Sequence, residues 1–271
     1  MSAIDDAFER CAEEKRAAFI PFLMAGDPDL GATPDLLRAL SAAGADVIEL
    51  GIPFSDPIAD GPVNQRAATR ALAAGATLAG ILGAVASVRD DLEAPVVLFS
   101  YFNPIRARGL ELFAEQAAAS GVDGVLCVDL PPEEAEEAYL PALKKNYIDP
   151  VFLLAPTSTS ERMRRVGEVS SGFVYYVSRT GVTGERELLT KTLPKEVKRV
   201  RRKVKLPVAV GFGISTPEQV AAVGEFADGV VVGSALVRVV EEGGADVARR
   251  LEARARQLAA PLLAEPKRRW A

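Results

Sequence analysis

Eight short apolar runs, each followed by a segment with helical spacing, predict a closed (β/α)8 TIM barrel with an extra N-terminal helix. Each run is too short for a helix and lacks strict alternation of polar and apolar residues. Both properties are typical of strands that are buried on both faces of a parallel sheet. The 271-residue chain has the length of such a barrel, and no long polar linker divides it. We therefore expect a single domain over residues 1–271.

The elements are expected in alternating order along the chain. The amphipathic segment 4–16 is expected to form the extra helix and to cover the floor of the barrel. The expected strands are residues 19–24, 46–50, 95–100, 124–128, 150–154, 173–177, 207–211 and 229–232. The expected helices are residues 35–43, 78–89, 110–120, 132–145, 160–169, 193–203, 217–224 and 245–263. Thr33-Pro34 and Thr216-Pro217 suit helix starts, with threonine as the cap and proline in the first turn.

The composition is that of an ordinary globular enzyme. Hydrophobic residues make up 49% and charged residues 25% of the chain, enough for a sizeable core. The net charge of -5 argues against a protein that binds the nucleic-acid backbone. Cys11 and Cys127 lie in unrelated surroundings, so we expect no disulfide framework. The acidic N-terminus lacks the features of a signal peptide, and no apolar run is long enough to span a bilayer, so we expect a cytoplasmic protein.

The chain contains no histidine. Imidazole is the usual general base near neutral pH, a usual member of catalytic triads and a common metal ligand. Its absence argues against most hydrolase mechanisms and many metalloenzyme mechanisms. Acid/base chemistry would therefore depend on carboxylates, tyrosines, hydroxyl groups and backbone amides, and we expect no metal site.

Glu49 is the strongest candidate for such chemistry. It lies at the end of an apolar run and precedes a turn-rich stretch, 51–62, which would place it at the active end of the barrel. Burial among apolar neighbours is expected to raise its pKa, so that it exchanges protons near neutral pH. The structural alternative is a carboxylate that caps a helix or pairs with an arginine. Asp60 is a second candidate, although Asp56 and Asp60 both also suit a role as turn formers.

Further polar residues lie within or after other expected strands, at the same end of the barrel. They are Tyr101, Asp129, Tyr175 and Thr183. Lysines occur only outside the expected strands, which argues against an aldolase that forms a Schiff base on a lysine inside the barrel. Cleavage of a carbon–carbon bond stays open if the substrate supplies its own electron sink.

Two glycine-containing loops predict a phosphate site. Gly213 follows the seventh expected strand, and Gly233 with Ser234 follows the eighth, ahead of a short apolar helix at 235–240. Glycine lets the backbone approach an anion, and free amides at a helix N-terminus favour negative charge. The alternative is that these glycines only turn each strand into its helix. The long loop 178–191, which contains Thr183 and Gly184, is expected to act as a lid.

Four strings of residues resemble the tryptophan synthase alpha chain family. They are 19–28, 48–62, 178–184 and 211–215, and they occur in order and at family-like spacing. The most specific string is Ile-Glu-Leu-Gly-Ile-Pro-Phe-Ser-Asp-Pro-Ile-Ala-Asp-Gly-Pro at residues 48–62. Met24 departs from the pattern, because the family often has threonine at this position. The resemblance covers residues 15–240 and agrees with the predicted barrel.

The resemblance implies a lyase that cleaves indole-3-glycerol phosphate to indole and glyceraldehyde 3-phosphate, with no cofactor in this chain. It assigns Glu49 as the main acid/base and Asp60 as the acceptor of the indole N–H, with Thr183 orienting Asp60. It assigns the substrate pocket to Phe22, Phe99, Leu126, Val128, Leu153, Tyr175, Thr183 and Phe212. It assigns the phosphate to Gly184, Gly213, Gly233 and Ser234. Without the resemblance, the apolar members of this set would be interpreted as barrel core.

The resemblance also implies a partner, the beta chain that carries pyridoxal phosphate, in an alpha2beta2 assembly for tryptophan biosynthesis. The expected contact surface comprises loops 55–60, 103–108 and 129–134. Two alternatives are a stand-alone indole-glycerol-phosphate lyase without a beta partner and a catalytically idle allosteric subunit.

Overall fold

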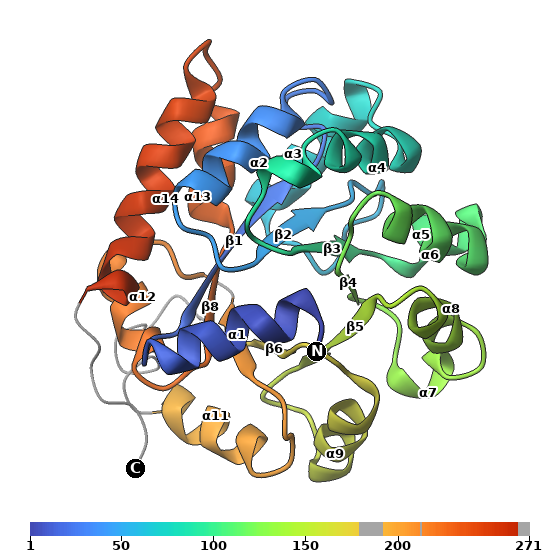
Figure 1. The fold of residues 1–271 in the computed structure, drawn as a ribbon, viewed down its shortest axis with the longest axis vertical. Helices are drawn as coiled ribbons and strands as arrows, with labels where there is room; N and C mark the ends of the chain where they lie inside the picture. Colours follow the sequence, from blue (N-terminus) through green and yellow to red (C-terminus); the bar gives the residue numbers. More distant parts are fainter. Residues whose placement is uncertain (179–191, 212, 265–271) are drawn as a thin grey trace.

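A computed structural model describes residues 1–178, 192–211 and 213–264 of the protein. Eight parallel strands form a closed barrel in sequence order, and β8 pairs with β1 to complete it. The helices surround these strands in a ring (Figure 1). The strands are β1 Ala18–Met24, β2 Ile48–Gly51, β3 Val96–Ser100, β4 Gly124–Cys127, β5 Asp149–Leu154, β6 Val174–Val177, β7 Val208–Gly211 and β8 Gly229–Val232. The predicted fold and all eight predicted strands are confirmed.

The helices that flank the strands also follow the predicted order. Those before β5 are α1 Ala3–Glu13, α2 Thr33–Ala42, α3 Pro62–Ala73, α4 Leu78–Ala86, α5 Phe102–Arg108, α6 Leu110–Ala119, α7 Pro132–Ala135 and α8 Tyr139–Lys145, with a short 3-10 turn at Arg89–Asp91. Those after β5 are α9 Ser160–Val169, α11 Leu193–Arg201, α12 Pro217–Gly224, α13 Ser234–Glu241 and α14 Val247–Leu263. The buried faces of most of these helices pack on the outside of the barrel in one continuous hydrophobic cluster, whereas those of α1 and α3 belong to two smaller clusters.

Four details of the helix prediction were wrong. Helices α3 and α5 were not predicted, because each begins directly after a segment that was interpreted as loop. The expected helix 132–145 is two helices, because Pro141 has no N–H to continue a hydrogen-bond ladder from the preceding turn. Thr33 does not cap α2: it is the first helical residue, and its hydroxyl accepts a hydrogen bond from the Gly26 N–H at 3.0 Å. Thr216 caps α12 as predicted, in a capping box with Gln219.

Helix α1 closes the floor of the barrel, as predicted. Ile4, Phe8 and Cys11 are buried in a cluster with inward-facing residues of the strands. The rings of Phe8 and Phe173 lie 5.4 Å apart between centroids. Figure 1 shows the helix lying across the strands. The floor is therefore a packed apolar plug, and a ligand can enter the barrel only from its other end.

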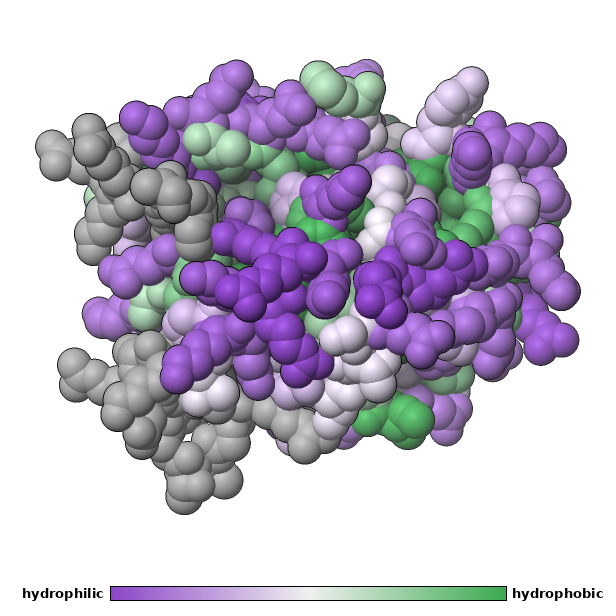
Figure 2. All heavy atoms as spheres, turned by 90° about the horizontal axis from the view of Figure 1, so that it is seen from below, coloured by the Kyte–Doolittle hydropathy of each residue, from purple (hydrophilic) through white to green (hydrophobic). Residues whose placement is uncertain are grey.

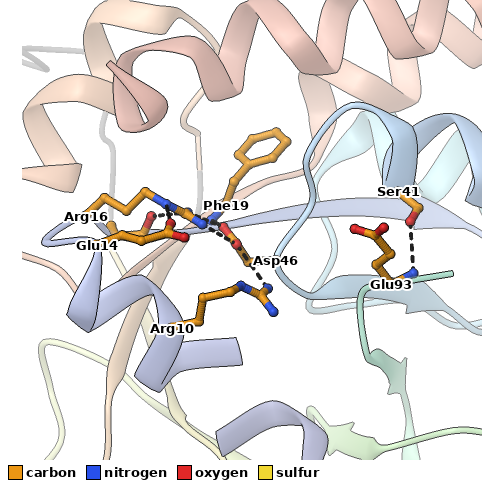
Figure 3. A network of polar contacts seen from close by, with 8 residues as sticks. Arg10, Glu14, Arg16, Phe19, Ser41, Asp46 and Glu93 are labelled. Atoms are coloured by element: carbon orange, nitrogen blue, oxygen red, sulfur yellow. Dashed lines mark hydrogen bonds and ion pairs between the residues drawn. The ribbon is translucent and has the colours of Figure 1, made fainter. Parts of the chain in front are cut away.

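A buried ion pair fixes α1 and β1 to the start of β2. Asp46, only 3% exposed, accepts hydrogen bonds from both terminal nitrogens of Arg16, at 2.6 and 2.8 Å, and from the Phe19 N–H at 2.8 Å. Arg10 adds a longer contact of 3.5 Å (Figure 3). Both oxygens of this carboxylate therefore have strong partners. Asp46 lies two residues before the first residue of β2, and its side chain makes these contacts across the floor of the barrel.

The outer surfaces of the helices are polar. Figure 2 shows the face at the side of α9 and α11, where hydrophilic residues predominate and apolar residues occur in separate spots. In the part of the chain that the structure describes, no single helix is long and apolar enough to cross a membrane. Helices α3 and α4 reach that length and composition only as a pair bent by 94°.

Candidate active site

A cavity of about 380 Å³ opens at the C-terminal ends of the strands. Its described lining residues are Phe22, Glu49, Ala59, Asp60, Gly61, Pro62, Val63, Asn64, Phe99, Val128, Leu153, Tyr175, Val177, Gly213, Val231, Gly233, Ser234 and Arg238. Residues from six of the strands and from the loops after β2, β4, β7 and β8 therefore converge on one space. This is the end at which barrel enzymes place their chemistry.

A larger hollow of about 880 Å³ lies at the opposite end, between α1 and the segments around α11 and β7. Its charged groups include Arg16 and Arg201, which are already paired with Asp46 and Asp228. It contains none of the residues predicted for catalysis. We therefore assign the site to the smaller cavity, where a buried carboxylate lacks a partner.

That carboxylate belongs to Glu49, on β2. Its residue is 1% exposed, between Ile48 and Leu50, which are fully buried. Its Oε1 atom is buried and has no hydrogen-bond partner among the described residues. Burial, with a smaller contribution from the negative charge of Asp60, raises its pKa from 4.5 to about 8. Glu49 is therefore protonated at neutral pH and close enough to its pKa to give up the proton and recover it.

Asp60 lies in the loop between β2 and α3, half-buried at the cavity wall. The Tyr101 hydroxyl donates to its Oδ2 at 2.9 Å and accepts from the Ala59 N–H at 3.0 Å. Burial raises the pKa of Asp60, and hydrogen bonds from the side chains of Tyr101 and Asn64 oppose that rise. In contrast, the Ser55 hydroxyl donates to Asp56 at 2.6 Å on the exposed part of the loop, outside the cavity. Only one of the three polar residues on this loop thus reaches the site.

Apolar side chains form most of the cavity wall. Phe22 and Phe99 meet edge to face, with ring centroids 5.5 Å apart. Gly51 makes room for this pair, because a Cβ there would lie 2.7 Å from the Phe22 ring. Val128 and Leu153 complete the wall on the side of β4 and β5. The resulting slot suits a flat aromatic ligand.

Leu126 and Met24 do not line the cavity. Leu126 is fully buried in the floor cluster with α1, one inward-facing layer below Val128. This position is that of a barrel-core residue, the alternative interpretation of Leu126. Met24 packs beside Phe22 in a small cluster with α3 and α13.

Tyr175 lines the cavity from β6 and is 7% exposed. Burial raises its pKa well above the ordinary value, and the charges of Glu49 and Asp60 raise it further. A Cβ at Gly211 would overlap the Tyr175 hydroxyl, so the glycine is needed for this side chain to fit. Tyr175 is thus held as a neutral phenol close to both carboxylates.

The predicted phosphate-binding residues that the structure describes meet at one end of the cavity. Gly213, with a φ of +79°, and Gly233 with Ser234 all line it. Helix α13 begins at Ser234, so the first N–H groups of the helix have no partner within it. Arg238 lies one turn further along α13 and is the only cationic residue in the described lining. Thr183, Gly184 and Phe212 lie outside the described residues.

The helices behind the two halves of the site are joined by ion pairs. Arg66 and Arg70 of α3 both contact Glu241 of α13, at 2.6 and 2.9 Å. Arg70 also binds Asp27, in the loop after β1, through two hydrogen bonds of 2.9 and 2.7 Å. Because α3 follows Asp60 and α13 carries Ser234, these contacts fix the carboxylate end of the cavity relative to its glycine-rich end.

Sequence reasoning missed Asn64 and Arg238. A helix start at Pro62 would have placed Asn64 in the first turn beside Asp60, but α3 was not predicted. Arg238 was within reach of prediction, because it follows Ser234 by one helical turn. Within the described ranges, no group of three Cys, Asp or Glu side chains is placed to hold a metal ion. Burial raises the pKa of the Cys11 and Cys127 thiols, so neither is an activated nucleophile.

Comparisons with known proteins agree with this geometry. The family model described as "Tryptophan synthase alpha chain" matches residues 8–263. The tryptophan synthase alpha chain of Geotalea daltonii is 52% identical over 242 residues, which are 89% of this chain and 91% of that protein. That of Dechloromonas aromatica is 52% identical over 249 residues, 92% of each chain.

Solved structures give the same result. The tryptophan synthase subunit alpha of Legionella pneumophila superposes with a TM-score of 0.89 at 39% identity, covering 97% of this chain and 98% of that one. A chain of Mycobacterium tuberculosis tryptophan synthase gives a TM-score of 0.87 at 39% identity, covering 96% and 98%.

Proposed function

The chain belongs to the tryptophan synthase alpha chain family, and from that premise we propose that its cavity cleaves indole-3-glycerol phosphate to indole and glyceraldehyde 3-phosphate. Membership makes the protein a lyase with the alpha-subunit role in tryptophan biosynthesis. It favours neither a stand-alone lyase nor an idle allosteric subunit. The observation that carries the proposed reaction is the buried Glu49 carboxyl, whose Oε1 has no partner among residues 1–178, 192–211 and 213–264 and whose pKa is about 8.

The proposed reaction starts and ends with a protonated Glu49. The carboxyl group gives its proton to C3 of the indole ring, which leaves a cationic iminium as an electron sink. The Glu49 carboxylate then removes the proton of the hydroxyl group on the adjacent glyceryl carbon. The carbon–carbon bond breaks, its electron pair returns to the ring, and the hydroxyl carbon becomes the aldehyde. A pKa near neutrality suits a group that must both give and take a proton.

Asp60 is proposed to accept the hydrogen bond of the indole N–H and to stabilise the positive charge that develops on the ring. Its position at the cavity wall and its bond from Tyr101 support this role, because the charge is met by a carboxylate that is already oriented. Phe22 and Phe99 are proposed to hold the ring, with Leu153 and Tyr175 beside it. Thr183, which the proposal assigns to orienting Asp60, lies outside the described residues.

The phosphate is proposed to bind at Gly213, Gly233 and Ser234. The free amides at the start of α13 and the glycine backbone suit an anion at this point. Arg238 supplies a full positive charge at the same end. No other cationic side chain in the described lining could neutralise a dianionic phosphate. Gly184 and Phe212, the other assigned residues, lie outside the described part of the chain.

A beta chain with pyridoxal phosphate is proposed as the partner, in an alpha2beta2 assembly, with no cofactor in this chain. The proposed contact face is the open end of the barrel. There Ile58 is 89% exposed in loop 55–60, and segment 103–108 is part of α5 rather than a loop. The first N–H of α5 donates to Asp129 at 2.7 Å, which joins two of the three proposed contact segments.

An indole-release assay tests the proposal. The isolated chain is incubated with indole-3-glycerol phosphate, with and without a tryptophan synthase beta chain, and indole and aldehyde are quantified. We expect equal amounts of both products and faster turnover with the beta chain. No release under either condition would refute the proposed reaction, and release that a beta chain neither binds nor alters would refute the proposed partner.

A further inference from the structure

Asn64 presents an unpaired polar atom to the cavity. It lies in the first turn of α3, four residues after Asp60, and is part of the cavity lining. Its Oδ1 atom is buried and has no hydrogen-bond partner among the described residues. Apart from the Glu49 carboxyl, it is the only atom of this kind in the described lining. A buried acceptor without a donor is unfavourable, unless a ligand supplies the donor.

The other end of the Asn64 amide faces a catalytic group. The Asn64 side chain lies close enough to the Asp60 carboxylate to lower the pKa of that group, as a hydrogen-bond donor does. Because an ionised carboxylate only accepts hydrogen bonds, the amide nitrogen must be the end that points to Asp60. The Tyr101 hydroxyl donates to Oδ2 of the same carboxylate at 2.9 Å. Two donors from different parts of the chain, Tyr101 directly after β3 and Asn64 in α3, thus fix the orientation of Asp60.

We propose that Asn64 is a positioning residue for the reaction, whose amide nitrogen orients the Asp60 carboxylate and whose Oδ1 accepts a hydrogen bond from the bound substrate. The inference rests on the proposed function, because indole-3-glycerol phosphate supplies the donors: its glyceryl hydroxyl groups, since its single ring N–H is proposed to bind Asp60. Binding would then give the Asn64 Oδ1, which has no partner among the described residues, a hydrogen-bond donor, and would couple substrate recognition to the placement of Asp60.

The neighbouring Gln65 shows what a purely structural amide does on this loop. Its nitrogen donates to the backbone oxygens of Asp60 and Pro57, at 2.9 and 3.3 Å. These bonds hold the loop, and the side chain does not line the cavity. Gln65 is therefore a matched control for Asn64: the same chemical group, adjacent in sequence, bonded to the same loop but not to the carboxylate.

The kinetic test compares Asn64→Leu, Asn64→Ala and Gln65→Leu with the parent chain, with indole-3-glycerol phosphate as substrate over a range of pH. We expect both Asn64 variants to lose about tenfold in kcat/KM, as removal of a hydrogen bond to a charged group predicts. The acid limb of their pH profiles should move to higher pH, because the bond from Asn64 holds the pKa of Asp60 down. Gln65→Leu should lower the melting temperature without moving that limb.

The binding test identifies the donor. A substrate analogue that keeps the indole and the phosphate but lacks the glyceryl hydroxyl groups is titrated into the parent and Asn64→Leu. We expect unchanged binding of the analogue together with a raised KM for the true substrate, which assigns a glyceryl hydroxyl group as the donor to Oδ1. Weaker binding of the analogue to the variant would contradict this assignment, because the ring N–H would then be the donor.

Two results would overturn the inference. One is an Asn64→Leu chain with the kcat/KM and pH profile of the parent. The other is a Gln65→Leu chain whose acid limb moves as far as that of Asn64→Leu, since the effect would then come from the loop. If the parent chain itself releases no indole, the proposed function fails instead, and the two failures are distinguishable.

Discussion

Two buried carboxylates, Asp46 just before β2 and Glu49 within it, have opposite surroundings. Asp46, at the floor, accepts hydrogen bonds from Arg16 and from the Phe19 N–H, so both of its oxygens are paired. Glu49, three residues later at the cavity, is equally buried but has an oxygen without a partner in the part of the chain that the structure describes. The floor uses a buried charge to join elements together. The cavity keeps a carboxyl group poorly solvated and unpaired, so that its proton is available for chemistry.

The difference has a direct consequence for stability. The pKa of Glu49 is raised in the folded state from 4.5 to about 8, so folding favours its protonated form. The corresponding contribution is fully present below pH 4.5 and is lost as the pH rises through about 8. The free energy of unfolding should therefore be lower above about pH 8 than at acidic pH, because Glu49 is then ionised in its buried position.

The largest expected effect is on turnover. Glu49→Gln keeps the shape of the side chain but removes the exchangeable proton, and general acid/base catalysis is typically worth about 10²- to 10⁴-fold. We expect indole release to fall by about 10³-fold or more, with binding of the phosphate-bearing substrate retained. Single-turnover kinetics and substrate titration measure the two quantities separately. Turnover equal to that of the parent would refute the assignment.

Replacing the other buried carboxylate, Asp46, by its amide should lower stability rather than turnover. Asp46→Asn removes the buried partner of Arg16 and leaves it only the half-exposed Glu14 carboxylate as a counter-charge, and breaking a buried pair costs about 3–5 kcal/mol. We expect the free energy of unfolding, measured in urea, to fall by about 3 kcal/mol. Turnover of the folded fraction should stay within roughly twofold of the parent, because the floor is far from the reacting atoms. An Asp46→Asn chain that is as stable as the parent but inactive would contradict this assignment of Asp46 to stability.

Asp60→Asn gives the next effect in size. The amide keeps the hydrogen bond from Tyr101 but removes the negative charge that faces the ring, and loss of one preorganised electrostatic contact typically costs about 10²-fold. We expect indole release to fall by roughly that factor. An unchanged rate would make Asp60 a turn-forming residue, the alternative that its sequence also allowed.

Arg238→Met gives the smallest effect. The side chain is exposed at the cavity edge, so its charge is partly screened by solvent. We expect KM for the phosphate substrate to rise about tenfold while kcat changes little, since the residue would contact only the non-reacting end. A fall in kcat at unchanged KM would place Arg238 outside phosphate binding.

The sequence predicted the barrel because its strands are buried on both faces and their apolar runs therefore stand out. Residues tied to strand ends were also predictable: Glu49, Asp60, Gly213 and Ser234 all reach the cavity. Leu126 lies in the layer below the described cavity lining, since inward-facing residues stack in layers whose depth depends on the register between strands, which no single strand reveals.

The position of Asn64 in the cavity depends on where α3 begins. That start is set by Gly61 and Pro62, directly after the loop that carries Asp60. When only local composition is considered, a turn-rich segment that runs into a helix is predicted to be loop over its whole length. For the same reason the hydroxyl of Thr33 was assigned to a helix cap, whereas tertiary packing directs it to Gly26. Local signals fixed the order of the elements, and long-range contacts decided how individual polar side chains are used.

The central claim is that Glu49 holds its proton near neutral pH. Carboxyl resonances of the parent chain, labelled with ¹³C at glutamate, are followed by NMR from pH 4 to pH 10 and compared with those of Glu49→Gln. We predict one resonance that is absent from the variant and titrates with a midpoint near pH 8. A midpoint near 4.5, the ordinary value for glutamate, would contradict the account.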